Sequence, residues 1–265
     1  MLSQAQIKHL KSLHQKKYRQ LEGKILLEGH RLIHQALMAE ADIKTAWITD
    51  NFAKSTSGRE LIQMLIEKNI LIETASEQSI ERICDSQNSQ GIIAVIPLPI
   101  YEPLQDIPSH SLYLDDISDP GNMGTLLRTA VWFGIDAVFL SPDCVDSLNS
   151  KVIRSAMGAH FHLQKLMSIS HDELFEKYTK VGYAILGSDM GGESLLNLQI
   201  DLDKGWILIL GSEAHGMSDA LRSYITHSIS IPGFGDMESL NVAVAGGILL
   251  HSLTASMRLL QTEKK

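Results

Sequence analysis

Cysteine is scarce in this sequence, since Cys84 and Cys144 are the only two among 265 residues. They lie far apart and lack the C-x-x-C or Cys/His spacing that a structural metal site requires. His160 and His162 share one face of an extended segment, but no further ligand is spaced to join them. We therefore expect two reduced thiols and no metal centre.

Long hydrophobic runs are absent as well. The longest, such as Ile92–Ile96 and Trp206–Leu210, are too short to span a bilayer. The segment Met1–Lys11 lacks the apolar core of a signal peptide. We expect a cytoplasmic protein that does not bind a membrane.

Three familiar motifs are also missing. The sequence has no G-x-x-x-x-G-K-[ST], no G-x-G-x-x-G after a strand and no G-x-S-x-G. The missing motifs argue against nucleotide hydrolysis, Rossmann-type redox chemistry and esterase chemistry. Asp115, Asp116 and Asp119 resemble a metal cluster, but Asp115 and Asp116 would point to opposite faces of an extended strand. We interpret them as a structural turn.

The net charge of −8 is unevenly spread along the chain. Up to Pro97, twelve Lys and Arg stand against eleven Asp and Glu, whereas the rest of the chain has eleven against twenty. The basic excess is concentrated in the opening segment, at Lys8, Lys11, Lys16, Lys17, Arg19, Lys24 and Arg31. This asymmetry predicts a local basic patch on a chain whose total charge disfavours nucleic acid.

Strand-like and helix-like segments alternate up to Pro97, which indicates an α/β sandwich. The expected helices are 7–21, 29–39, 60–68 and 79–84, and the expected strands are 25–27, 45–49, 70–74 and 91–97. Four prolines between Pro97 and Pro108 disfavour a sustained helix or central strand there. We predict a first domain over 1–97, a linker over 98–110 and a second domain over 111–265.

The alternation resumes in the second domain, with three Gly-, Asn- and Ser-rich loops after strand-like runs. The expected strands are 111–114, 137–140, 183–187, 206–210 and one around Ile229, and the expected helices are 124–133, 151–157 and 241–260. The loops are Asp119–Gly124, Gly211–Gly216 and the stretch from Ile231 to Asn241. Because ligands bind at the carboxyl ends of strands in open α/β sheets, the loops predict one composite pocket and an enzyme.

Each loop has a chemical and a structural interpretation. In the first, Arg128 would lie near the opening turns of a helix that begins near Gly124, where a guanidinium can bind phosphate or stabilise negative charge. In the second, Gly211 and Gly216 allow close backbone approach to a ligand, and Glu213 is the only carboxylate. Plain helix starts, with a surface arginine, a dipole-complementing glutamate and capping Ser or Asn, explain the same residues equally well.

Together these residues resemble the motifs of the SpoU family of ribose 2′-O-methyltransferases, within the knotted SPOUT superfamily. Asp119-Pro120-x-Asn122-x-Gly124 with Arg128-Thr129-Ala130 and Phe133-Gly134 is similar to the first family motif, Gly211-x-Glu213-x-x-Gly216 to the second, and Ile231-Pro232 with Ser239-Leu240-Asn241-Val242 to the third. Arg154–Ala159 resembles a further landmark, so the likeness spans about 111–258. Two departures are Gly233, where the family usually has a larger apolar residue, and His251-Ser252, which replaces a common Tyr-Glu.

The first domain, with Leu27-Glu28-Gly29 and its basic opening helix, is similar to the small ribosomal-protein-like substrate-binding domain of many rRNA-directed members. The resemblance therefore implies an α/β protein in which this domain precedes a trefoil-knotted, parallel-sheet methyltransferase domain. It also implies S-adenosylmethionine as cofactor, RNA as partner, no metal, and a homodimer with its active site at the subunit interface.

The resemblance assigns roles residue by residue. The catalytic residues would be Arg128, Asn122, Glu213, Ser239 and Asn241. The cofactor would be held, largely through backbone groups, by Gly187, Leu210, Gly211, Gly216, Ile231 and Leu240. RNA would be held by Lys16, Lys17, Arg19, Arg31 and Arg154. Because a guanidinium pKa lies above about 12, we expect Arg128 to stabilise the substrate oxygen as a cation rather than to accept its proton.

The leading hypothesis is 2′-O-methylation of a ribose in rRNA, of the large subunit in particular. Methylation of tRNA uses the same catalytic residues and stays open, as does a modification that confers drug resistance. A non-catalytic RNA-binding protein on the same fold is the alternative from another class.

Overall fold

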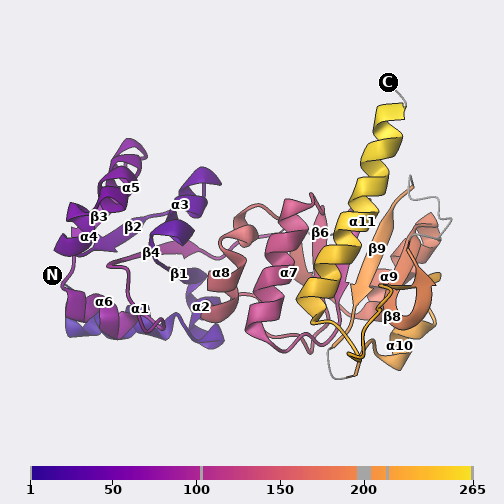
Figure 1. The fold of residues 1–265 in the computed structure, drawn as a ribbon. Helices are drawn as coiled ribbons and strands as arrows, with labels where there is room; N and C mark the ends of the chain where they lie inside the picture. The colour runs from indigo at the N-terminus through magenta and orange to yellow at the C-terminus, as the bar shows by residue number, and fades with distance from the viewer. Residues whose placement is uncertain (1, 102–103, 196–203, 213–214, 264–265) are drawn as a thin grey trace. The chain divides into compact units, whose positions relative to one another are not determined.

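The structure is a computed structural model that describes residues 2–101, 104–195, 204–212 and 215–263. The chain forms two compact units (Figure 1). The first unit contains residues 1–100 together with 148–162, and the second contains 101–147 and 163–265. Residues 148–162, which we name the crossing segment, thus belong to the first unit although they lie within the second half of the sequence.

The first unit is built on a four-stranded sheet with helices on both faces. Its strands are β1 (Lys24–Glu28), β2 (Thr45–Ile48), β3 (Leu71–Thr74) and β4 (Ile92–Pro97), in the order β1-β4-β2-β3. β4 runs antiparallel to β1 and β2, and β2 runs parallel to β3. Its helices are α1 (Gln4–Ser12), α2 (Lys16–Glu22), α3 (His30–Met38), α4 (Asp50–Lys54), α5 (Thr56–Glu67), α6 (Glu77–Ile83), α8 (Ser150–Ala156) and the 3-10 turn η1 (Ala159–Phe161).

The strands of this sheet send alternate side chains to two separate cores, as the period of two in a strand requires. Ile25 and Leu27 of β1 join the core that includes α3 and α5, whereas Leu26 joins the core that includes α1 and α6. Ile153 of the crossing segment is buried in the first of these cores, where Leu148 also packs. The crossing segment is therefore held in the first unit by apolar burial.

One helix expected over 7–21 is in fact two, because the chain breaks between α1 and α2. Arg19 of α2 is buried, and its Nη1 donates to the carbonyl oxygens of Leu13 at 3.2 Å and His14 at 2.6 Å. The last carbonyls of a helix have no partner within the helix. Here the guanidinium bonds the carbonyls of the C-cap Leu13 and of His14, just beyond α1, and a helical periodicity does not predict this break.

The second unit is built on a six-stranded sheet in which every pairing is parallel. Its strands are β5 (His110–Leu114), β6 (Ala137–Leu140), β7 (Lys165–Ser168), β8 (Ala184–Ser194), β9 (Trp206–Leu210) and β10 (His227–Ser230), in the order β10-β8-β9-β5-β6-β7. Its helices are α7 (Pro120–Trp132), α9 (His171–Val181), α10 (Asp219–Arg222) and α11 (Val242–Glu263). Each residue of β6 and β9 is buried, as expected for strands covered on both faces.

Helices cover both faces of the second sheet. α7 and α11 pack against each other (Figure 1), and Gly246 of α11 lies so close to Leu126 and Leu210 that an added Cβ would come within 2.7 Å of both side chains. α9 packs on the sheet through Phe175 and Tyr178. The predicted α/β class, with a parallel sheet preceded by a small α/β domain, is confirmed. Among the described residues, no helix has both the length and the apolar character needed to cross a membrane.

Candidate active site

The first loop lies at the start of α7, which begins four residues earlier than expected. Asp119 is the N-cap, and its Oδ1 accepts a hydrogen bond from the backbone N–H of Asn122 at 2.8 Å. Pro120 occupies the first helical turn, where its missing N–H costs nothing. Asn122 therefore lies in the first turn, at the carboxyl edge of the sheet, and Arg128 is exposed further along the helix.

The third loop meets the first through a direct hydrogen bond. Asn241 Nδ2 donates to Asn122 Oδ1 at 3.0 Å, across 119 residues of sequence. Asn241 Oδ1 accepts from the N–H groups of Ala243 at 3.0 Å and Val244 at 3.3 Å, so the same side chain caps α11. The capping interpretation of Asn241 is thus confirmed, and the same amide also bonds Asn122.

The second loop is narrow because two glycines let its backbone close on itself. Gly216 N donates to Ser212 O at 2.8 Å, and Gly216 has a φ of 66°. A Cβ on Gly211 would lie 2.3 Å from the Gly216 carbonyl carbon and the Met217 N. Glu213 lies outside the described residues.

Asp115, at the carboxyl edge of the second sheet, was not predicted as a site residue, because the sequence pattern assigned it only to a turn. Its backbone N donates to Leu210 O at 2.9 Å, and its buried carboxylate accepts from the backbone N–H of Ser218 at 2.9 Å. Ser218 is the N-cap of α10, but its own side chain makes no capping bond. The only sequence feature that could have indicated a role for Asp115 is its place as an acidic residue directly after an apolar strand.

β8 is longer than the strand expected at 183–187, because it continues past a bulge. Its pairing with β10 jumps from Gly187 to Glu193. In the bulge, Asp189 accepts from Gly191 N at 3.0 Å and from Arg222 Nη1 of α10 at 3.0 Å. The Gly191 N–H and the Arg222 guanidinium hold the pKa of the Asp189 carboxyl below its usual value.

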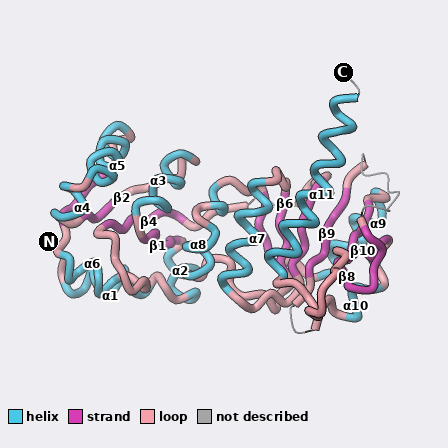
Figure 2. Tube along the Cα trace, viewed as in Figure 1, coloured by secondary structure: helices cyan, strands magenta, loops and turns pink. Residues whose placement is uncertain are grey.

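The remaining cofactor candidates lie in β8, at the end of β9 and in the third loop. A Cβ on Gly187, just before the bulge of β8, would come within 2.5 Å of Ile225 and 3.0 Å of Met217, so this position accepts only glycine without rearrangement. Leu210 is buried, Ile231 is half-buried and Leu240 is half-exposed. Figure 2 shows the loop that leads into α11, whose residues 232–240, including Ser239, are all exposed.

The structure thus brings Asn122 and Asn241 into contact and places Gly211 directly after β9. In the described part of the chain, no hydrogen bond joins Arg128 or Ser239 to that pair. Likewise, no group of three or more His, Cys, Asp or Glu side chains in the described ranges is placed to hold a metal ion. Both cysteines are free, and burial raises the pKa of the Cys84 thiol to about 12.

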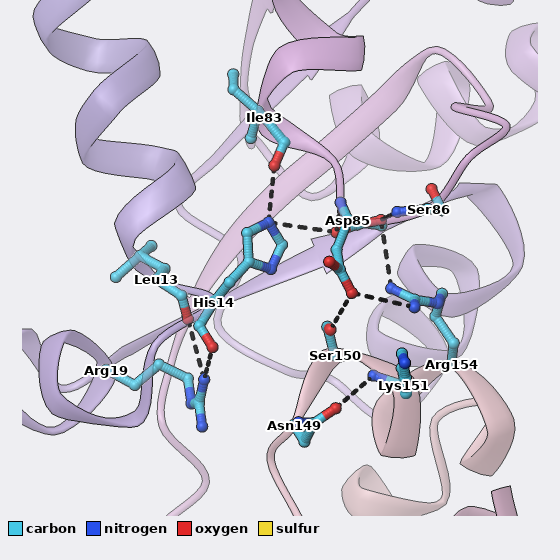
Figure 3. A network of polar contacts seen from close by, with 11 residues as sticks. Leu13, His14, Arg19, Ile83, Asp85, Ser86, Asn149, Ser150, Lys151 and Arg154 are labelled. Atoms are coloured by element: carbon cyan, nitrogen blue, oxygen red, sulfur yellow. Dashed lines mark hydrogen bonds and ion pairs between the residues drawn. The ribbon is translucent and has the colours of Figure 1, made fainter. Parts of the chain in front are cut away.

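The candidate RNA-binding cations of the first unit differ in availability. Lys16, Lys17 and Arg31 are exposed, whereas Arg19 is buried in the α1–α2 break described above. Arg154 of the crossing segment is half-buried and forms ion pairs with two carboxylates (Figure 3). Arg19 and Arg154 thus already have partners within the fold, whereas the three exposed cations are open to solvent.

A polar network surrounds Arg154 (Figure 3). Arg154 Nη2 lies 3.3 Å from Asp85 Oδ2, which also accepts from Ser150 Oγ at 2.7 Å. Arg154 Nη1 lies 3.6 Å from Glu28 Oε2, and Glu28 accepts from the backbone N–H groups of Asp85 and Ser86. His14 Nε2 approaches Glu28 Oε1 at 3.5 Å. The network ties α8 of the crossing segment to β1 and to the turn after α6.

Comparison with known proteins adds to this geometry. The family model described as the SpoU rRNA Methylase family matches residues 109–251, and that described as the MRM3-like substrate binding domain matches residues 4–94. The chain is 32% identical to the 23S rRNA (guanosine(2553)-2′-O)-methyltransferase RlmP of Bacillus subtilis over 93% of this chain and 95% of that protein.

Two solved structures are similar over nearly the whole chain. An RNA 2′-O ribose methyltransferase matches with a TM-score of 0.82 at 25% identity, covering 97% of both chains. An AdoMet-bound rRNA methyltransferase from Sinorhizobium meliloti matches with a TM-score of 0.81 at 24% identity, also covering 97% of both chains. This second likeness is one of fold.

Proposed function

Because the chain belongs to the SpoU rRNA methylase family, we propose that it transfers the methyl group of S-adenosylmethionine to a ribose 2′-oxygen of large-subunit rRNA. The observation that carries the proposal is the Asn122–Asn241 hydrogen bond, which joins the first and third motifs at the carboxyl edge of the parallel sheet. Ligands bind at this edge in open α/β sheets. Exposed Arg128 stands on the same helix as Asn122.

The residues of this edge fit the cofactor. At Gly216 nothing lies within 4 Å of an added Cβ, so a ligand can approach the backbone of the second loop closely there, whereas Ile225 and Met217 already pack against Gly187. Ile231 and Leu240, near the two ends of the exposed third loop, offer apolar surface and backbone groups. Leu210 supports the edge from the core. Bound S-adenosylmethionine supplies an electrophilic methyl group on a sulfonium.

The protein then has to hold a ribose hydroxyl in line with that methyl group and stabilise the oxygen as it loses its proton. Arg128 is a permanent cation and stabilises the developing negative charge. Asn122, fixed by Asn241, orients the hydroxyl, and Ser239 contacts the hydroxyl or a neighbouring phosphate. Glu213 shapes the loop at the cofactor. Alignment of the reacting atoms carries most of the rate enhancement in such a scheme.

A second copy of the chain belongs to the proposal. Trp132 at the end of α7 is 81% exposed, and Val244 and Ile248 of α11 are 51% and 41% exposed. α7 carries Asn122 and Arg128, and Asn241 directly precedes α11. Because both helices expose large apolar side chains, burying them in a homodimer removes apolar surface from water. We place the active site beside that interface, in a knotted domain, in a protein that acts in the cytoplasm.

RNA binding is assigned to the first unit, through exposed Lys16, Lys17 and Arg31. Because a carboxylate-rich second unit repels phosphate, the affinity has to come from such local cations. Binding should weaken steeply with salt as counterions are released.

The test is transfer of a labelled methyl group from S-adenosylmethionine to separate pools of undermodified rRNA and tRNA, with the labelled nucleotide mapped. Label at a ribose 2′-oxygen of large-subunit rRNA is the expected result. Label only in tRNA would replace the substrate and keep the chemistry. Label in neither pool, together with RNA binding but no cofactor binding, would favour a non-catalytic RNA-binding protein.

A further inference from the structure

Asp115 makes hydrogen bonds at both ends of the second loop. Its backbone N–H bonds Leu210 O, the last residue of β9 before the loop, at 2.9 Å. Its carboxylate Oδ2 accepts from the N–H of Ser218, the first residue beyond Met217, at 2.9 Å. Asp115, which directly follows β5, therefore joins the two ends of a loop that lies about a hundred positions further along the chain, at a separation of 103 residues for the second bond.

The Asp115 carboxylate binds the carboxyl end of the second loop, where the short helix α10 offers few stabilising contacts of its own. α10 spans only Asp219–Arg222, and its N-cap Ser218 gives no side-chain bond. A helix this short is unstable by itself, since most helical stability in proteins comes from packing. A charge-assisted bond from a buried carboxylate to the N-cap N–H therefore sets where the loop ends.

The position of the loop gives this closure a functional meaning. Gly211 and Gly216 belong to the loop, and Met217 packs beside Gly187, which lies just before the bulge of β8. These three glycines are cofactor candidates of the proposed function. A loop that is already closed needs less ordering when its ligand arrives, and so binds more tightly.

We propose that Asp115 is a positioning residue for cofactor binding, which holds the second loop closed through Ser218 before S-adenosylmethionine arrives. The inference rests on the proposed function, because it takes the second loop as the cofactor loop. Asp115 touches the loop and not the reacting atoms. Its loss should therefore weaken cofactor affinity more than it lowers the rate of transfer at saturating cofactor.

Three test variants and one control separate the hydrogen bond from the charge. Asp115→Asn loses the charge but keeps an acceptor oxygen, whereas Asp115→Ala loses both. Asp116→Asn is the matched control, because it removes a charge from the neighbouring residue and Asn tolerates the φ of 54° found there. Ser218→Pro removes the N–H donor from the exposed end of the bond, and the φ of −61° at Ser218 suits proline.

The measurements are calorimetric binding of S-adenosylmethionine to each full-length variant, and the KM for cofactor and kcat of methyl transfer. Asp115→Ala and Ser218→Pro should each raise the cofactor Kd about tenfold, the size expected for loss of a hydrogen bond to a charged group. Asp115→Asn should stay within about threefold of the parent and Asp116→Asn should match it. Hydrogen exchange of the Ser218 amide should quicken in Asp115→Ala.

Two outcomes would overturn the inference. One is an unchanged cofactor affinity in Ser218→Pro. Any loss of cofactor affinity in Asp115→Ala would then come from general damage to the core and not from the lost hydrogen bond. The other is faster exchange at Ser218 with unchanged affinity, which would make the closure irrelevant to the cofactor. Failure of the proposed function has a different signature, namely a parent protein that binds S-adenosylmethionine but methylates no rRNA.

Discussion

The two side chains of the Asn122–Asn241 hydrogen bond differ in their other contacts, and substitutions can distinguish the two residues. Asn241 both caps α11 and orients Asn122, whereas Asn122 has no part in that cap. We therefore expect the stability and the activity of the protein to depend on these two residues to different degrees.

We expect Asn241→Ala to lower both the free energy of unfolding, by about 1 kcal/mol for the lost cap, and kcat. Asn122→Ala should lower kcat with a much smaller effect on stability. Chemical denaturation and single-turnover methyl transfer would measure the two quantities. If Asn122→Ala retained full activity, the bond would be structural only, and Asn122 would leave the catalytic set.

Arg128 is exposed, so its replacement should leave the fold intact. We expect Arg128→Ala to bind S-adenosylmethionine with the parent affinity but to transfer methyl groups at least about a hundredfold more slowly, because it removes the charge that stabilises the oxygen. Arg128→Lys restores the charge without the forked geometry and is the matched control. Unchanged turnover in Arg128→Ala would remove this residue from the mechanism.

At the scale of elements, α8 is held by charges that respond to acid. The hydrogen bond from Ser150, with Arg154, lowers the pKa of the Asp85 carboxyl below its usual value. A depressed carboxyl pKa contributes stability above the unfolded value near 3.8, and that stability is lost as the pH falls through the lower folded value. The network is therefore complete at neutral pH.

We expect Asp85→Asn to lower the thermal midpoint at pH 7 and to converge on the parent as the pH falls through the lowered pKa of the folded parent, where the carboxyl of the parent is protonated too. The effect is small, because the Asp85 side chain is 43% exposed and solvent screens the pair. Thermal unfolding at pH 7, 5 and 3 checks this. A midpoint difference that stays constant over this range would mean that ionisation of Asp85 does not stabilise the unit.

The elements themselves were largely predictable from the sequence. Parallel strands buried on both faces are apolar runs, so β5, β6 and β9 were located from composition alone. Helix beginnings were harder, since Asp119 and Pro120 also suit a turn. α9 was missed although it is amphipathic, and α10 is too short for a periodicity to reveal.

The candidate site was predictable only in part. The meeting of the first and third motifs followed from the rule that strand ends share one edge, and Asn122 and Asn241 confirm it. The bond from Asp115 to Ser218 could not be inferred, because no local pattern links residues 103 positions apart. The roles assigned to the individual catalytic and cofactor residues remain predictions.

At the scale of the whole molecule, the exposed apolar faces of α7 and α11 predict the oligomeric state. We expect Ile248→Lys combined with Val244→Lys to shift the protein from dimer to monomer and to reduce methyl transfer, since two buried charges would oppose association. Light scattering coupled to gel filtration measures the mass. Ile66→Lys on α5, which is also exposed, is the control and should leave the mass unchanged. A parent protein that is monomeric throughout would contradict the proposed dimer.

The crossing segment has a consequence for how this protein can be divided. Since residues 148–162 belong to the first unit, the chain passes between the units three times, after residues 100, 147 and 162. A single cut near the proline-rich stretch would strip Ile153 of its apolar partners and leave Asp85 without Arg154. The first unit therefore cannot be exchanged as one contiguous segment of sequence. A chimaera that takes this unit from a related protein must also take the matching α8.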